Sequence, residues 1–547
     1  MSNKKRVLII GIDGATFNII NPLLSDNKLP TFQKIINQGI HGILNSSLPL
    51  HSATGWTSLV TGKNSGKHNV YDLYEKFNGS YNRRVINKQN VKTKTLWDIL
   101  GEHNRKSVVM NIPVTYPPTK INGIMVSGML TPPGELFTYP EHLSEELYNK
   151  DYIIDIFYHY KDSIEDFVEL AFKTISLRKQ AFTGLLKSND WDFSIVDFTA
   201  VDRLQRTIWQ RESQIQKLYI KLDSLIGEIL EETVDDNTYV MIISNHGFKS
   251  ISKKFFVNEW LWESGLLSKK VSTQRASIPD FWEYQYGYRR NKKTAISKFL
   301  ATTKITKDNI RSLLPDMLCE LIKKATPASS RRLFPKENLI INWDYTKAYF
   351  SSQFSQGINI NLKGREPRGI VKSGKEYEQL RDQVIHELYR LKDPQTFENV
   401  IDEVYRGEDI FFGEYEKNAP DIVFVPHNYN YVLEPNKRTS KNCICYAHDD
   451  FPVFSQPDSD GIFLMTGPRI KKGIDTTKLK IFDIAPTVLS ILDIPVPTDM
   501  DGTVMSDVLE CDEYISLDEH EQADYSYISD FYDDRAYKYG NLGLVSI

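Results

Sequence analysis

The sequence is poor in cysteine and has no long hydrophobic run. Four cysteines in 547 residues exclude a disulfide-stabilised scaffold. Cys443 and Cys445 are also too close together for a CxxC zinc hook. No stretch of ~20 apolar residues is present, so no transmembrane helix is predicted. The apolar run at residues 7–12 is too short for a signal peptide and ends in Asp13. We therefore expect a cytoplasmic protein.

The chain lacks a large excess of either charge. Its 67 Lys and Arg and 71 Asp and Glu leave a net charge of −4, which excludes the polycation typical of nucleic-acid-binding proteins. With 41% hydrophobic and 25% charged residues, the composition is that of a globular protein. The charge is unevenly distributed. Residues 266–336 hold 16 Lys or Arg and 5 Asp or Glu, whereas residues 507–534 hold 11 Asp or Glu and no Lys or Arg.

These charge differences suggest a division of the chain. We interpret residues 266–340 as an inserted basic helical cap subdomain and residues 507–547 as an acidic C-terminal tail. Residues 1–265 and 341–506 are then the two parts of one core. A basic cap could collect an anionic ligand by focusing the electric field, although a solvated basic surface explains the composition equally well.

Six short hydrophobic runs are typical of strands covered on both faces, because each is nearly continuous and rich in β-branched or aromatic residues. Helical patterns at residues 204–230 and 376–391 lie between them. This alternation predicts an α/β fold with a doubly wound, mostly parallel sheet flanked by helices. In such sheets, ligands bind at the carboxyl ends of the strands. The runs are residues 7–12, 107–112, 193–198, 239–243, 421–425 and 461–465.

Polar residues follow three of these runs. Asp13 follows the first run, and Asn245 and His246 follow the run at 239–243, in a pattern that suits metal binding. Asp202 lies beyond the run at 193–198, and Arg206 is four residues further, at the spacing of a helical ion pair. Each feature alone is weak evidence, because a capping Asp or a buried, hydrogen-bonded His would look the same.

The segment at residues 49–62, Pro-Leu-His-Ser-Ala-Thr-Gly-Trp-Thr-Ser-Leu-Val-Thr-Gly, is rich in hydroxyl groups. A hydroxyl at a helix N-terminus lies beside free backbone N–H groups and the positive end of the helix dipole, which favours phosphate. On composition alone, a capped helix that ends at a glycine is the simpler interpretation.

Taken in their order along the chain, the motifs resemble those of the alkaline phosphatase superfamily, and within it the type I phosphodiesterase/nucleotide pyrophosphatase branch. The resemblance covers nearly the whole chain and implies a two-metal site, usually zinc, at the strand ends. It also implies a Ser or Thr nucleophile that attacks phosphorus. The segments that carry it are Asp13 with the opening strand and residues 56–68, 201–206, 244–247, 361–371, 460–463, 483–487 and 495–502.

Carried over position by position, the resemblance places the nucleophile at Ser52, with Thr54 as the near alternative. Thr54 and Lys67 are expected to contact the substrate, although a loop that anchors the helix end is the simpler interpretation of Lys67. The ligands of the metal that holds the nucleophile match Asp13, Asn245 and His246. The ligands of the second metal match Asp202, Arg206 and a position near Gln456 or Pro457.

The sequence departs from the family pattern at these ligands. Where the family has Asp, this chain has Asn245, which keeps an oxygen ligand but removes a negative charge. Where the family has two His, it has Arg206 and the Gln456–Pro457 pair. Arg stays protonated, with a pKa above ~12, and cannot ligate a metal. We therefore expect one metal site to survive and the second to be lost, with Arg206 free to hold a phosphate-like anion bidentately.

Two functions stay open. The first is a phosphodiesterase, phosphohydrolase or related group-transfer enzyme that uses Ser52, one divalent metal and Arg206 on an anionic phosphorylated small molecule. The alternative is a metal-poor pseudoenzyme that binds a phosphate ligand or a protein. The retained Asp13, Ser52, Asp202 and His246 favour the enzyme. His159 and His448 could rebuild the second site, but their spacing gives no support. A homodimer would fit the family, and no nucleic-acid partner is indicated.

Overall fold

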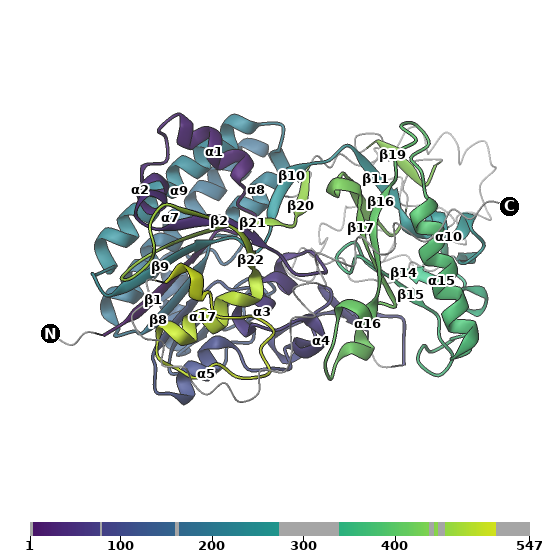
Figure 1. Ribbon diagram of the computed structural model, residues 1–547, viewed down its shortest axis with the longest axis horizontal. Helices are drawn as coiled ribbons and strands as arrows, with labels where there is room; N and C mark the ends of the chain where they lie inside the picture. The colour runs from purple at the N-terminus through teal and green to yellow at the C-terminus, as the bar shows by residue number, and fades with distance from the viewer. Residues whose placement is uncertain are drawn as a thin grey trace, which may run out of the picture.

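A nine-stranded sheet forms the centre of the larger lobe of the molecule (Figure 1), in a computed structural model that describes residues 4–76, 79–158, 163–272, 338–436, 442–446 and 455–509. The five central strands are parallel to one another: β9 (Thr238–Ile243), β1 (Arg6–Gly11), β8 (Phe193–Asp197), β5 (Ser107–Met110) and β6 (Gly123–Val126). The sheet continues outward through β21 (Asp460–Thr466), β2 (Ile40–Asn45) and β22 (Ile474–Lys480), and on the other side through β7 (Thr138–Tyr139).

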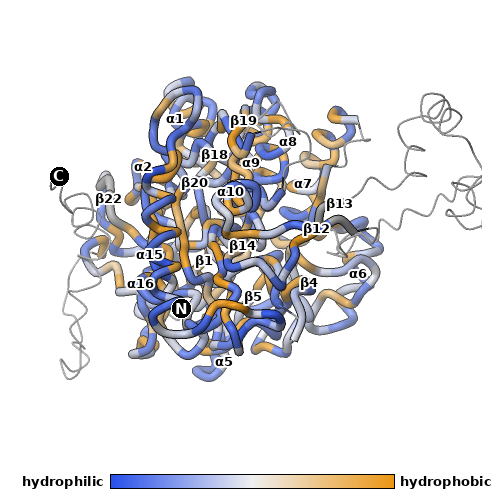
Figure 2. The backbone as a smooth tube through the Cα atoms, turned by 90° about the vertical axis from the view of Figure 1, so that its right-hand side faces the viewer, coloured by the Kyte–Doolittle hydropathy of each residue, from blue (hydrophilic) through white to orange (hydrophobic). Residues whose placement is uncertain are grey.

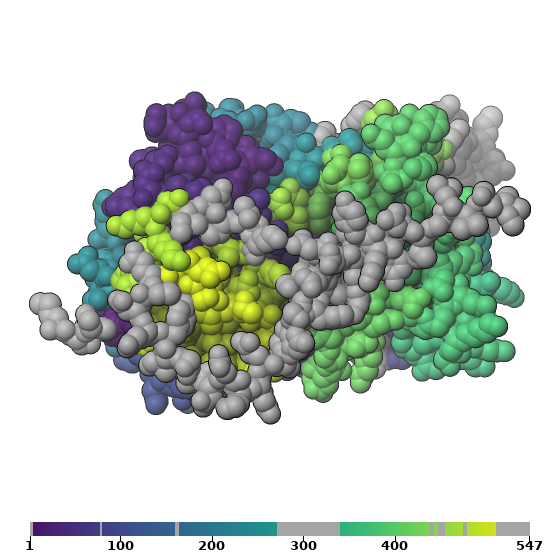
Figure 3. All heavy atoms as spheres, in the orientation of Figure 1, coloured from purple at the N-terminus to yellow at the C-terminus, as the bar shows by residue number. Residues whose placement is uncertain are grey.

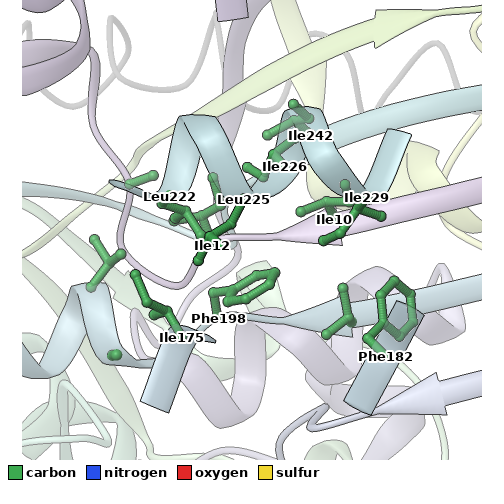
Figure 4. Packing of buried hydrophobic residues seen from close by; sticks show 14 of the residues in the cluster. Ile10, Ile12, Ile175, Phe182, Phe198, Leu222, Leu225, Ile226, Ile229 and Ile242 are labelled. Carbon is green, nitrogen blue, oxygen red and sulfur yellow. The ribbon is translucent and has the colours of Figure 1, made fainter. Parts of the chain in front are cut away.

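Helices cover both faces of this sheet, because successive residues of each strand point to opposite faces. Leu8 and Ile10 of β1 pack with one set of helices, as Figure 4 shows for Ile10, whereas Val7 and Ile9 pack with the other set. The first set is α1 (Phe17–Ser25), α2 (Pro30–Gln38), α7 (Ile164–Ser188), α8 (Ala200–Ile208) and α9 (Glu212–Thr233). The second is α3 (Ser52–Thr61), α5 (Leu96–Glu102) and α17 (Ile484–Ile491). The predicted doubly wound fold is confirmed.

A second, smaller lobe has its own hydrophobic core and is mainly antiparallel. In Figure 3 it is mostly green, whereas the purple and yellow parts of the chain lie together in the larger lobe. Its four-stranded sheet contains β14 (Ala348–Phe350), β15 (Gly357–Ile360), β17 (Ile422–Pro426) and β16 (Ile401–Arg406). Around it lie α10 (Val257–Glu263), α15 (Lys375–Arg390), α16 (Gly407–Ile410) and a three-stranded sheet of β18 (Tyr431–Glu434), β11 (Lys253–Phe256) and β19 (Ile444–Tyr446).

Two predicted parallel strands prove to be antiparallel, so that part of the prediction is wrong. Residues 421–425 correspond to β17 in the smaller lobe, and residues 461–465 correspond to β21, which is antiparallel to both of its neighbours. Both strands are buried on two faces, since alternate residues of each belong to different hydrophobic clusters. A continuous apolar run indicates such burial and carries no information about strand direction.

The predicted helix at 376–391 is confirmed as α15, whereas the pattern at 204–230 is divided between α8 and α9. Near the two ends of the predicted insertion, β12 (Lys269–Ser272) and β13 (Asn338–Ile341) pair as antiparallel strands. Residues 273–337, 510–547, His159 and His448 lie outside the described residues, so the helical cap and the acidic tail stay predictions. Shorter elements include β3 (Tyr74–Lys76), β4 (Arg83–Val85), α4 (Ser65–His68), α6 (His142–Asn149), β10 (Gly247–Ser250) and β20 (Ser455–Asp458).

In Figure 2, many hydrophobic segments (orange) run through the inside of the molecule. Hydrophilic segments (blue) are more common along its outline. Among the described residues, no helix combines the length and the hydrophobicity that crossing a membrane requires.

Candidate active site

Five buried polar residues meet at the carboxyl ends of the central strands. Asp13 follows β1, Asp202 lies on α8 just after β8, and Asn245 and His246 follow β9. Because β1 lies between β8 and β9 and all three are parallel, their ends share one edge of the sheet. Ser52 is the first residue of α3, which packs against the same edge.

The Ser52 hydroxyl lies between the carboxylate of Asp13 and the imidazole of His246. Its Oγ donates to Asp13 Oδ1 at 3.1 Å and lies 3.4 Å from His246 Nε2. The His51 side chain caps α3 by accepting the backbone N–H of Thr54 at 3.4 Å, which fixes where the helix begins. Ser52 therefore lies at the positive end of the helix dipole, where a phosphate group is favoured.

Glycine allows α3 to approach the strand ends closely. A Cβ atom on Gly55 would lie 3.1 Å from Asn245 Cβ, so a larger residue would push the helix and the Asn245 side chain apart. Gly55 is three residues after Ser52, one helical turn along α3. This contact places the first turn of the helix, and Ser52 with it, against the end of β9.

His246 presents an unprotonated nitrogen to its neighbours. Its Nδ1 lies 2.9 Å from the Gly247 carbonyl oxygen, so Nδ1 carries the proton and Nε2 keeps its lone pair. Burial lowers the pKa of His246 to about 4, so the ring is neutral near pH 7. Nε2 lies 3.4 Å from Asp13 Oδ1 and 4.0 Å from Asp202 Oδ1.

Several polar atoms on this side have no hydrogen-bond partner among the described residues. They are Asp13 Oδ2 and both amide atoms of Asn245, and all are buried. Buried polar atoms are nearly always paired, so these atoms are available to a ligand. Burial, followed by the charge of Asp202, raises the pKa of Asp13 to about 7, and a bound cation would offset this effect.

These residues fit one divalent cation. Asp13, Asp202 and His246 offer ligand atoms that lie within 4.8 Å of one another. Of these three, Asp202 already accepts hydrogen bonds from Arg203 and Arg206 on both oxygens. Asp13 and Asn245 also have unpartnered oxygens, and His246 Nε2 is unprotonated, so these side chains offer O and N donors of the kinds that zinc accepts. The structure thus brings together the predicted ligands Asp13, Asn245 and His246 beside Ser52.

The Asp202 side of the site, in contrast, is already neutralised by arginine. Arg206 Nε donates to Asp202 Oδ1 at 3.0 Å and Oδ2 at 2.9 Å, which confirms the predicted ion pair. Arg203 Nη1 donates to Oδ2 at 2.5 Å. Although burial opposes it, these two guanidinium groups hold the pKa of Asp202 below its usual range.

Arg203 and its partner Asp155 were not identified from the sequence as residues of the site. Arg203 Nη2 lies 2.8 Å from Asp155 Oδ2, and its guanidinium stacks 4.6 Å from the centre of the Phe157 ring. Arg203 is next to Asp202 in the chain, and neighbouring helical residues normally point in different directions. No sequence signal links Asp155 to either residue, because only the tertiary fold brings its loop to α8.

The two predicted substrate contacts are held by other protein groups. Thr54 Oγ1 lies 2.8 Å from His51 Nε2 and donates to the Val70 carbonyl at 3.3 Å. Lys67 pairs with Asp501 and donates to the Asp499 carbonyl at 2.8 Å. Their roles as substrate contacts stay predictions.

A family match shows that the chain is a member of the alkaline phosphatase superfamily. The family model for type I phosphodiesterase/nucleotide pyrophosphatase matches residues 7–449, so the chain belongs to this family of phosphoric ester hydrolases. The resemblance inferred from the motifs is thereby confirmed. A comparison with curated proteins finds no significant match.

Solved structures share the fold at low sequence identity. Phosphonoacetate hydrolase from Sinorhizobium meliloti 1021 is 10% identical, with a TM-score of 0.55 over 89% of this chain and 96% of that one. The alkaline phosphatase PafA is 15% identical, with a TM-score of 0.51 over 93% and 99% of the two chains. Human ectonucleotide pyrophosphatase/phosphodiesterase 5 is 13% identical, with a TM-score of 0.50 over 93% and 100%.

Proposed function

We propose that this protein hydrolyses a phosphoric ester of an anionic small molecule, with Ser52 as the nucleophile and one divalent metal as cofactor. The observation that carries the proposal is the position of Ser52 Oγ, 3.1 Å from Asp13 Oδ1 and 3.4 Å from His246 Nε2 at the start of α3. Membership of the phosphodiesterase family supports the reaction class. A phosphodiester fits the family description best.

In the proposed reaction, Ser52 Oγ attacks phosphorus while its proton passes to Asp13 Oδ1, which already accepts its hydrogen bond. A bond forms between Oγ and phosphorus, and the bond to the ester oxygen of the leaving group breaks. Asp13 then releases this proton to solvent. Water attacks phosphorus, the bond between phosphorus and Oγ breaks, and a proton of the water restores the Ser52 hydroxyl. Transfer to another acceptor would differ only in this second step.

The metal would be held by Asp13, Asn245, His246 and the Ser52 oxygen. Bound there, it would lower the pKa of the Ser52 hydroxyl and balance the charge of the phosphoryl group. The residues themselves orient the nucleophile. His246 keeps its free lone pair on Nε2 because the Gly247 carbonyl holds the proton on Nδ1.

Arg206 would contact the phosphoryl oxygens. Its Nε is bound to Asp202, but its two Nη atoms have no protein partner among the described residues, and the side chain is 34% exposed. A guanidinium with two free N–H edges is suited to a phosphate-like anion.

The test is turnover of an activated diester, bis(4-nitrophenyl) phosphate, by the full chain loaded with zinc. Ser52→Ala should lower kcat at least about 1,000-fold, since a covalent route is lost. Ser65→Ala is the matched control. It removes a buried serine hydroxyl on α4 that has no partner in the described part of the chain, and it should keep the wild-type rate.

Mass spectrometry of quenched wild-type enzyme should find phosphate on the Ser52 peptide. Equal turnover by Ser52→Ala and wild type would reject Ser52 as the nucleophile. Binding of the diester without turnover by either protein would instead favour the alternative of a pseudoenzyme that serves as a phosphate-binding module.

A further inference from the structure

We propose that the position of the family's second metal is filled in this protein by a guanidinium cluster, formed by Arg206 and Arg203 on Asp202. The family pattern gives that metal three ligands, of which the chain keeps only Asp202. The inference rests on the proposed function only in placing the phosphoryl group beside Ser52. The contacts that exclude a metal from Asp202 do not depend on the proposed function.

The Asp202 carboxylate has little capacity left for a metal. Arg206 Nε bonds to both of its oxygens, at 3.0 and 2.9 Å, and Arg203 Nη1 bonds to Oδ2 at 2.5 Å. A dication at this carboxylate would lie beside two permanent positive charges. Arginine cannot be deprotonated in a protein, so these charges cannot be removed.

Both guanidinium groups are held from behind as well as by Asp202. Arg206 lies 5.3 Å from the centre of the Phe248 ring, a cation–π distance. Arg203 is bound by Asp155 through two nitrogens, at 2.8 and 3.3 Å, and rests on Phe157. The cluster is therefore a packed arrangement and not a flexible side chain that a metal could easily displace.

The strand register identifies which residue replaces the third ligand. Phe248 of β10 is paired with Pro457 of β20, and paired residues of antiparallel strands project from the same face. Pro457 is thus on the face of the ribbon that Phe248 presents to Arg206. Gln456 projects from the opposite face, where its Nε2 donates to the Tyr431 carbonyl at 3.1 Å. Proline has no ligand atom in its side chain, so this position cannot serve a metal.

The cluster supplies positive charge that does not depend on a metal. The free Nη atoms of Arg206 would bind phosphoryl oxygens in a protein stripped of metal, which a two-metal site could not do. This predicts two measurable properties: no metal at Asp202, and phosphate affinity that survives chelation.

Metal stoichiometry tests the first property. The purified full chain and the variant Arg206→His/Pro457→His are incubated with excess zinc, desalted and analysed for metal per chain. The double variant restores a ligand atom at both replaced positions and should bind one equivalent more than the wild type. Arg211→His is the matched control, because Arg211 forms an exposed ion pair with Glu165 at 2.7 Å, away from the site. It should equal the wild type.

The difference between variant and wild type decides the result. Two equivalents on the wild type would overturn the inference, as would a folded double variant that binds no more than the wild type. No metal on the wild type and one on the double variant would support the inference while contradicting the metal of the proposed function. The two failures are therefore distinguishable.

Calorimetric titration of the metal-free full chain with inorganic phosphate tests the second property. Arg206→Ala should weaken phosphate binding at least tenfold, and Arg206→Lys should fall between alanine and wild type because it keeps the charge but loses the fork. Phosphate binding that is equal in Arg206→Ala and wild type, or absent from metal-free wild type, would overturn the role given to the cluster. Neither readout needs turnover.

Discussion

The two halves of the site differ in how well their buried polar atoms are satisfied. On the Asp13 side, one carboxylate oxygen and a whole amide group have no partner among the described residues. On the Asp202 side, both carboxylate oxygens are bonded to arginine. Unpaired buried groups cost free energy unless a ligand completes them, whereas paired groups already contribute to the fold. The first half is therefore built to receive a ligand, and the second half is already complete.

The largest effect is expected from breaking the complete half. Arg203→Met would leave Asp202 and Asp155 short of a buried positive charge, since both bind Arg203. Loss of one partner from a buried ion pair costs about 3–5 kcal/mol, so the free energy of unfolding in urea should fall by that amount. Arg211→Met, at an exposed pair, should change it by less than about 0.5 kcal/mol. Equal unfolding curves for the two variants would contradict the comparison.

A change in the ligand-receiving half should affect metal binding and leave the fold intact. Asp13→Asn removes a carboxyl group whose charged form burial disfavours in the metal-free protein, so its melting temperature without metal should not fall. Zinc affinity should drop at least about 100-fold, or about 2.7 kcal/mol, because a charged ligand is lost. Asp26→Asn, an exposed carboxylate paired with Lys28, is the control for both measurements. Unchanged zinc affinity would show that the metal does not bind at Asp13.

The sequence was sufficient for the parts of the site that follow from parallel strands. Asp13, Asp202 and His246 each follow a buried hydrophobic run, and parallel strands bring such positions to one edge. The i, i+4 pair of Asp202 and Arg206 also follows from helical spacing alone. These features are local, so the spacing of residues along the chain determines them.

The remaining parts depend on contacts between distant segments. The pairing of Arg203 with Asp155 joins α8 to a loop 48 residues earlier, which no periodicity encodes. The choice between Gln456 and Pro457 depends on the register of β10 and β20, where a shift of one residue exchanges the faces. The direction of β17 and β21 was predicted wrongly for a related reason, since burial on both faces is common to parallel and antiparallel strands in a core.

A smaller effect, dependent on pH, should come from His68, which supports α3 from its interior. The Val70 N–H donates to its Nδ1 at 3.1 Å, so Nε2 carries the proton that bonds Ser58 Oγ at 3.0 Å. Burial lowers the pKa of His68 from 6.5 to about 3. Such a histidine gains its proton only on unfolding, so its contribution to stability falls as pH drops from about 6.5 towards 3.

The loss of unfolding free energy caused by His68 is about 2 kcal/mol at pH 5 and almost nothing at pH 7.5. Unfolding in urea at both pH values should therefore show a larger acid-induced loss for wild type than for His68→Gln. The other titrating groups, such as Asp72 with its raised pKa of about 6, which acts in the opposite direction, are present in both proteins and cancel in the difference. Parallel pH profiles would contradict a neutral, buried His68.

The smallest effect is expected from Lys67, and it separates a structural role from a substrate contact. Lys67 bonds to Asp501, but Asp501 also accepts from the backbone N–H and the side-chain amide of Asn64, at 2.7 and 2.8 Å. Lys67→Met should therefore cost only about 1 kcal/mol of stability and leave KM for the diester unchanged. Lys94→Met, which breaks an exposed pair with Glu102, serves as the control. A several-fold rise in KM with unchanged stability would instead mean that the ammonium leaves Asp501 to bind substrate, which would extend the ligand-receiving half of the site beyond Asp13 to α4.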